Sequence, residues 1–290
     1  MLQKLKFVPG FNKQATESGA EGQWTDGDYV RFRYGLPEKI GGWSQLTASE
    51  HTLPGVARAS HTFQSLDGER YSAIGTSQGL FLFYGSALYD ISPLDTAITG
   101  CTLTTSSGAG TTITINKASH GLLVGRYITL SAVSVTGDST LTAGILEKAY
   151  EILTVATDSF TITASTAETG TGMTAAGAAT VNPYYLVGPT TQTKGYGWGT
   201  ERTISTVTLD PGNWSLDNYG QVLVATISDG KTFTWNAGAS GPRAIRASQS
   251  TTDYVTTSNP TASMMTLVSD RDRHLFHIGT ETTIGDPTTQ

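Results

Sequence analysis

The stretch YSAIGTSQGLFLFYG, residues 71–85, decides the fold because its pattern returns twice. QVLVATISDGKTFTWNAG, residues 221–238, and MTLVSDRDRHLFHIG, residues 265–279, repeat an apolar strand, a tight polar turn, an aromatic second strand and a glycine. Phe233 and Phe276 lie 43 residues apart, within the roughly 40–50 residues of one four-stranded propeller blade. The repeats predict β-propeller-like blades, and the alternative is three hairpins that share only turn chemistry.

The composition supports an all-β protein. Only 14% of the 290 residues are charged, whereas 33 are glycines, and Ser and Thr are abundant. Such a chain favours strands joined by many turns over helices. The length allows about one to three domains, and 38% hydrophobic residues suffice for a folded core.

A second kind of sequence interrupts the blade pattern between residues 97 and 182. This Thr-, Ala- and Gly-rich segment contains the strand-like stretches TTITIN, RYITLSAV, YEILTVA and DSFTITAS. They predict an inserted small β-barrel or β-sandwich module. The domains are then residues 1–96, an N-terminal arm and the first blades, residues 97–182, the module, and residues 183–290, further blades.

Basic residues mark the candidate interaction sites. Lys4 and Lys6 give the N-terminal arm a local positive charge. Residues 29–34 alternate, so that Arg31 and Arg33 share one strand face. These cations can contact a partner or a phosphate, or protect a solvated edge strand against aggregation. Two further candidates, Arg271 and Arg273, lie near the last repeat.

No catalytic, cofactor-binding or metal-binding residue is predicted. The five histidines and the single Cys101 show no metal-ligand spacing, and neither a nucleophile elbow nor a phosphate-binding lysine motif occurs. We therefore expect no enzyme activity and no cofactor. A propeller glycosidase, the least favoured alternative, would need acids and arginines that converge on one channel mouth, for which Arg243, Arg246, Arg271 and Arg273 are the candidates.

The net charge and hydropathy limit the partners. A formal net charge of −6 disfavours a surface that grips nucleic acid broadly, although a channel that surrounds DNA without holding it is compatible with it. The start of the chain is too short and polar for a signal peptide, and no run reaches the roughly 18 apolar residues of a membrane helix. We expect no membrane span and synthesis in the cytoplasm.

Three stretches resemble the tail nozzle, or packaged-DNA stabilisation, proteins of short-tailed bacteriophages. They are GQWTDGDYVRFRYGLPEKIGGW, residues 22–43, YSAIGTSQGLFLFYG, and LVSDRDRHLFHIG, residues 267–279. The inserted segment resembles a small β-module of many phage structural proteins through SHGLLVGRYITLSAVSV, residues 119–135, and YEILTVATDSFTIT, residues 150–163. Both resemblances point to a virion component.

The resemblance implies a structural virion protein without enzyme activity. Such a subunit forms a ring, usually a hexamer, at the head–tail connection, where it retains packaged DNA and forms the ejection channel. Its partners are the portal-side tail adaptor protein, tail fibres, and DNA that passes without sequence-specific binding. The location is the virion tail, after assembly in the host cytoplasm.

The number of blades and the function each leave an alternative open. Outside the insert, about 200 residues supply only about four blades of roughly 45 residues, fewer than most closed propellers need, so we expect an incomplete propeller. The alternative function is a phage tail adaptor that binds the host surface or a carbohydrate, with the inserted module as its outward-facing binder.

Overall fold

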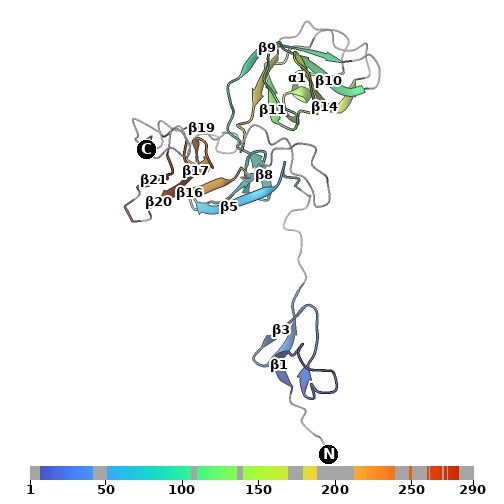
Figure 1. Ribbon diagram of the computed structural model, residues 1–290, viewed down its shortest axis with the longest axis vertical. Coiled ribbons are helices and arrows are strands. Elements are labelled where there is room, and N and C mark those ends of the chain that lie inside the picture. Colours follow the sequence, from blue (N-terminus) through green and yellow to red (C-terminus); the bar gives the residue numbers. More distant parts are fainter. Residues whose placement is uncertain are drawn as a thin grey trace, which may run out of the picture. The chain divides into compact units, whose positions relative to one another are not determined.

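The computed structural model describes residues 7–41, 51–105, 110–135, 140–168, 179–187, 212–238, 248–249, 260, 262–269, 271–272 and 274–280 (Figure 1). Within these ranges the secondary structure is β-strands, apart from the four-residue helix α1, Ala143–Leu146. The chain separates into two compact units, residues 1–50 and residues 51–290. The predicted all-β fold class is confirmed.

The N-terminal unit contains two small sheets. In the first, β1 (Val8–Phe11) pairs in parallel with β2 (Gln23–Trp24). In the second, β3 (Val30–Arg33) and β4 (Leu36–Lys39) form an antiparallel hairpin. Aromatic contacts join the two sheets, since the ring of Phe32 lies 5.2 Å from that of Phe11 and 6.5 Å from that of Trp24.

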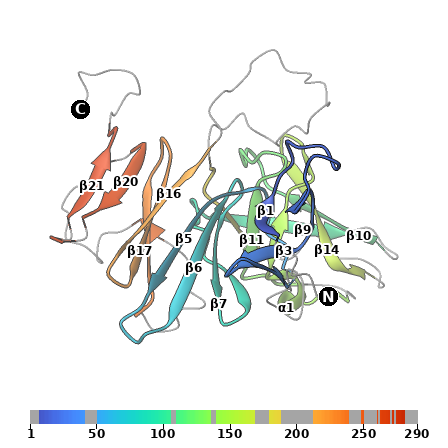
Figure 2. The ribbon, with the colours of Figure 1, turned by 90° about the horizontal axis from the view of Figure 1, so that it is seen from below.

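The first repeat folds into a four-stranded antiparallel sheet, here called the first blade. Its strands follow one another in sequence order: β5 (Ala57–Gln64), β6 (Arg70–Thr76), β7 (Leu80–Tyr84) and β8 (Ala87–Asp90). Figure 2 shows β5, β6 and β7 side by side. The two-residue turn before β8 is Gly85–Ser86, where both residues have positive φ, as a tight hairpin turn requires.

The second repeat folds in the same way into the second blade. Its strands are β16 (Trp214–Tyr219), β17 (Val222–Ile227), β18 (Thr232–Asn236) and β19 (Ser248–Gln249), again in sequence order. Asp229 turns the chain between β17 and β18 with φ +58°, a conformation that Asp tolerates better than most residues. The third repeat gives the antiparallel pair β20 (Met265–Val268) and β21 (Leu275–Ile278), the third blade. The predicted propeller-like blades are therefore present.

The first two blades enclose one hydrophobic core. Alternate residues of β6 and β7 meet alternate residues of β17 and β18, and the buried members are Phe63, Tyr71, Ala73, Leu80, Leu82, Ile91, Val187, Trp214, Leu223, Ala225, Ile227, Phe233, Trp235 and Ala237. All six residues of β17 are buried. A strand buried on both faces reads as a continuous apolar run, which explains the sequence VLVATI.

Residues 98–183 form a separate seven-stranded sheet in the order β12-β11-β15-β9-β10-β14-β13. The strands are β9 (Ile98–Thr105), β10 (Gly110–Asn116), β11 (Tyr127–Ser131), β12 (Ala149–Glu151), β13 (Thr154–Val155), β14 (Ser159–Glu168) and β15 (Ala179–Pro183). The two edge strands β12 and β13 are only two residues apart. The Ile152 N–H donates to Arg126 O at 3.0 Å, and the Leu153 N–H donates to Thr161 O at 2.9 Å. The two edges thus meet, and of the two predicted forms the sheet takes that of a barrel.

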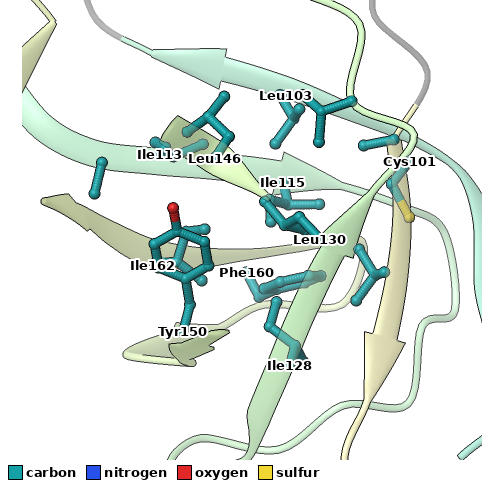
Figure 3. Close-up of a cluster of buried hydrophobic side chains, with 14 of the residues drawn as sticks. Cys101, Leu103, Ile113, Ile115, Ile128, Leu130, Leu146, Tyr150, Phe160 and Ile162 are labelled. Atoms are coloured by element: carbon teal, nitrogen blue, oxygen red, sulfur yellow. The ribbon is translucent and has the colours of Figure 1, made fainter. Parts of the chain in front are cut away.

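The interior of this barrel is a second hydrophobic core. Figure 3 shows Leu130, Tyr150 and Phe160 converging from β11, β12 and β14. Ile113, Ile115 and Ile162 are fully buried on β10 and β14. The core is mostly aliphatic, with the aromatic rings of Tyr150 and Phe160, and it shares no residue with the core between the first two blades.

Candidate functional site

The predicted arginine pair lies on the exposed face of the β3–β4 hairpin. Val30 and Phe32 are half-buried, whereas Arg31 and Arg33 point to solvent. Arg31 Nε contacts Glu38 Oε2 across the hairpin at 3.1 Å. Because both partners are about half exposed, this pair contributes little to stability. One of the two guanidinium groups is thus already engaged within the hairpin.

An exposed aromatic side chain stands at the tip of the same hairpin. Tyr34 and Gly35 have φ +51° and +77°, the backbone of a tight two-residue turn that normally favours Asn or Gly. The Tyr34 side chain is 91% exposed, and the Arg33 guanidinium lies 5.4 Å from its ring centroid. Sequence alternation placed Tyr34 on the face of Val30 and Phe32, but the turn directs it to solvent.

The other predicted cations do not join this pair. Arg271 lies exposed in the turn between β20 and β21, in the other unit. Lys4, Lys6, Arg243, Arg246 and Arg273 lie outside the described residues. Of the predicted cations, the structure therefore places only Arg31 and Arg33, within the described residues, on one strand face.

One buried and two partly buried polar contacts join the first and second blades, in addition to their shared core. Trp214 Nε1 donates to the backbone oxygen of Thr76 at 2.8 Å. His61 Nε2 lies 2.8 Å from Asn218 Oδ1, and Arg58 donates to Gly212 O. These contacts join segments about 140 to 160 residues apart in sequence. The packing of the two blades therefore depends on long-range hydrogen bonds.

The second and third blades meet through the opposite face of β16. Ser215 Oγ donates to Thr266 O at 2.9 Å and accepts from Thr266 N at 3.1 Å. Asp217 Oδ2 accepts from Val268 N at 2.7 Å, and the hydroxyl groups of Thr226 and Thr266 are in contact. Side chains of the second blade thus satisfy backbone groups of β20.

His277 lies inside this second interface. Its Nδ1 is 3.4 Å from Ser263 Oγ, and its buried Nε2 has no hydrogen-bond partner among the described residues. Burial lowers the pKa of His277 below its ordinary value, because the charged form loses hydration. The ring is therefore held neutral where the blades meet.

Among the described residues, the barrel meets the first blade at the two chain crossings near Leu94 and Tyr184. Leu94 and Tyr184 form an isolated antiparallel bridge. Arg126 donates from Nε and Nη2 to Tyr184 O at 3.0 and 2.9 Å, and from Nη2 to Asp95 Oδ2 at 2.7 Å. Tyr184 also donates to Asp90 of β8. The buried Arg126 guanidinium thus bonds both to the segment that enters the barrel, at Asp95, and to the segment that leaves it, at Tyr184.

The same clamp sets the ionisation of Asp95. Burial acts to raise the pKa of this carboxyl group, but the Thr96 N–H and the Arg126 guanidinium outweigh it, so the pKa lies below its ordinary value. The carboxylate is thus charged at neutral pH, and the Asp95–Arg126 ion pair persists there.

The described part of the chain offers few groups suited to catalysis or metal binding. It contains no group of three or more His, Cys, Asp or Glu side chains arranged to hold a metal ion. Cys101 is buried in the barrel core, and burial raises the pKa of its thiol, which disfavours the thiolate needed for nucleophilic attack or metal binding. No helix within the described ranges is long and apolar enough to cross a membrane.

The sequence analysis did not predict an exposed apolar face on the third blade. Four large side chains of the third blade, on the face turned away from the second blade, are exposed: Met265, Leu267, Phe276 and Ile278. The signal was present in MTLV and LFHI, which carry apolar residues at successive positions and hence on both strand faces. When both faces of a strand are apolar, the alternation of side chains does not indicate which face another sheet covers.

No protein-family model and no curated protein matches the chain. Among solved structures the chain is similar to the phage phi92 endosialidase, with 15% sequence identity and a TM-score of 0.26. The match covers 81% of this chain and 35% of that one, so the chain spans about a third of its neighbour's length. At this TM-score the likeness assigns neither a fold nor an activity.

Proposed function

We propose that the chain is a structural subunit of the tail of a short-tailed bacteriophage. In this proposal copies form a ring at the head–tail connection below the portal, a hexamer as in the tail nozzle proteins that the sequence resembles. The ring retains packaged DNA and later forms its ejection channel. The neighbours are the portal-side tail adaptor protein and tail fibres, and the site of action is the virion tail after assembly in the host cytoplasm.

The observation that carries the proposal is the stack of antiparallel blades with an uncovered apolar face at one end. A large apolar face on a folded sheet marks an assembly site, and a tail ring is an assembly of many such contacts. The three resembling sequence stretches lie in this stack and in the N-terminal hairpin. The net charge of −6 also suits a channel wall that must release DNA.

The test is imaging of the purified chain by negative-stain electron microscopy, alone and after mixing with the portal-side adaptor protein of the same phage. Rings with a central opening, which bind the adaptor, are the expected result. A stable monomer that ignores the adaptor would contradict the ring proposal.

A second function is favoured by one observation, the clamped barrel. A barrel with its own hydrophobic core is suited to carry a binding surface, and the second candidate is therefore a host-surface or carbohydrate-binding adaptor of the tail. This function predicts that the labelled full chain adsorbs to bacterial envelopes and that a chain without residues 97–182 does not. Equal adsorption by both would remove its support.

A further inference from the structure

The third blade is attached to the second blade mainly by polar contacts. Of the described hydrophobic residues of β20 and β21, Val268 alone is buried, with 8% of its surface exposed. None of the described residues of these strands belongs to the core between the first two blades. Figure 2 shows β20 beside β16, with β21 on its far side. Because apolar burial contributes little here, the attachment depends on hydrogen bonds.

These hydrogen bonds reach the third blade from β16 and from the turn between β17 and β18. The side chains of Ser215 and Asp217 bond to the backbone of β20. Just before β20, the Ser263 N–H donates to Gly230 O at 3.0 Å. Ser263 is fully buried, and its Oγ lies 3.4 Å from Nδ1 of His277. The histidine is thus part of the attachment.

The position of His277 makes a proton on its ring unfavourable. His277 pairs with Thr266 across the hairpin, so both side chains lie on the face toward the second blade. Its Nε2 atom is buried and has no hydrogen-bond partner among the described residues. Both ring nitrogens of an imidazolium carry a proton. The charged ring would therefore bury a donor without an acceptor, which costs free energy.

The charged groups of the neighbouring elements do not compensate this cost. On β16, Asp217 accepts a hydrogen bond from the backbone of β20. In the turn between β17 and β18, Asp229 and Lys231 carry opposite charges, and on the hairpin itself His274 is exposed to solvent. The pKa of His277 is lowered by burial, and no carboxylate offsets this effect.

We propose that the third blade is an acid-released element: when His277 takes up a proton, β20 and β21 separate from the second blade together, while the core of the first two blades stays folded. In the detached hairpin the charged ring reaches water. Segments with few buried apolar contacts open in this way without global unfolding. The inference does not depend on the proposed ring function.

The sign of the pH effect follows from linkage. The detached blade binds the proton near pH 6.5, the ordinary pKa of His, whereas the attached blade binds it at a lower pH. Detachment is therefore favoured progressively as the pH falls below about 6.5, and it is independent of His277 at higher pH.

The first experiment measures how fast a thiol on the hidden face of β20 reacts with a methanethiosulfonate reagent in the full chain. Val268→Cys places the thiol against the second blade, and Met265→Cys, the matched control, places it on the exposed face of the same strand. The ratio of the two rates at one pH removes the pH dependence of the thiol reaction. The buried native Cys101 reports on the barrel and is expected to stay unlabelled.

From pH 7.5 to pH 5.5, the rate for Val268→Cys relative to Met265→Cys is expected to rise by about three- to tenfold. His277→Gln, added to both variants, keeps a polar side chain that does not ionise and is expected to abolish the rise. A ratio that does not change with pH, or a rise that persists with His277→Gln, would overturn the proposal.

The second experiment needs no substitution. Hydrogen–deuterium exchange of the wild-type chain, read by mass spectrometry at pH 7.5 and pH 5.5, compares peptides from β20–β21 with peptides from β17–β18. After correction for intrinsic exchange rates, β20–β21 is expected to exchange faster at pH 5.5, and β17–β18 is expected to be unchanged. Equal acceleration of both hairpins would overturn the separate release of the third blade, and unchanged exchange in both would overturn its acid sensitivity.

Discussion

At the scale of single residues, the contact between Gly75 and Trp214 decides how closely the first two blades approach. A Cβ atom on Gly75 would lie 2.6 Å from the Trp214 indole ring, far inside van der Waals contact. The ring cannot retreat without loss of its hydrogen bond to Thr76 O. Glycine is needed here for close packing, and not for an unusual backbone angle.

Gly75→Ala is expected to lower the free energy of unfolding by about 1–3 kcal/mol, because an added methyl group overpacks a buried site. Urea denaturation followed by tryptophan fluorescence measures this change. Gly144→Ala, the same substitution in α1 with no atom within 4 Å, is the control and is expected to be neutral or to stabilise by up to about 1 kcal/mol. Equal stabilities of the two variants would contradict the packing argument.

The sequence predicted which residues are buried better than it predicted which residues they contact. Trp214 and Trp235 are buried between blades, as large aromatic residues in apolar strands predict. The Trp214 ring contacts a glycine of the first blade, about 140 residues earlier in the sequence. Nothing in the sequence near Trp214 predicts this contact. Tyr34 illustrates the reverse case, since the turn geometry at Gly35 overrode the strand alternation.

At the scale of elements, the third blade depends on the second for its anchorage. Its strand β20 is bonded by the side chains of Ser215 and Asp217, and β21 contributes the buried ring of His277. An imidazole that must stay neutral makes this interface sensitive to pH.

Stability is expected to fall as the pH drops from about 6.5, the ordinary pKa of His, through the lower pKa of folded His277. The unfolded chain takes up the proton first in this window, so the stabilisation is complete above it and lost below it. Thermal unfolding between pH 8 and pH 5 measures the effect. His277→Gln is expected to show a smaller pH dependence than the wild type, whereas His274→Gln, at an exposed position before β21, is expected to retain it in full.

The hairpins were predictable because a turn and two alternating strands lie within about 15 residues. The barrel was less predictable. The stretch YEILTVA was expected to be one strand, but Ile152 and Leu153 pass the chain from β11 to β14, which divides it into β12 and β13. The strands β9 and β15, which pair at the middle of the sheet, were not predicted, because pairing partners are not encoded by periodicity.

At the scale of the whole molecule, the described residues of the second unit contain two hydrophobic cores. The chain leaves the blades near Leu94 and returns near Tyr184, and these residues face each other in an antiparallel bridge. The proposed division into blades and an inserted module of residues 97–182 follows this arrangement. Excision of the module tests it directly.

A variant in which a short Gly-Ser linker replaces residues 97–182 is expected to fold, because antiparallel neighbours lie about 5 Å apart and a two-residue turn joins them. The blades should lose no more than about 2 kcal/mol of stability with the removal of Arg126 and its hydrogen bonds. Circular dichroism of Trp214 and Trp235 and urea denaturation provide the readout. An unfolded product would show that the blades need the module, against the proposed division.

The Leu94–Tyr184 bridge also determines how the molecule carries tension. The hydrogen bonds from Asp95 N to Pro183 O and from Tyr185 N to Pro93 O, at 2.8 and 2.9 Å, connect the two crossings in parallel with the barrel. A stretching force that pulls the two crossings apart is therefore shared between the barrel strands and these bonds, together with the Arg126 contacts.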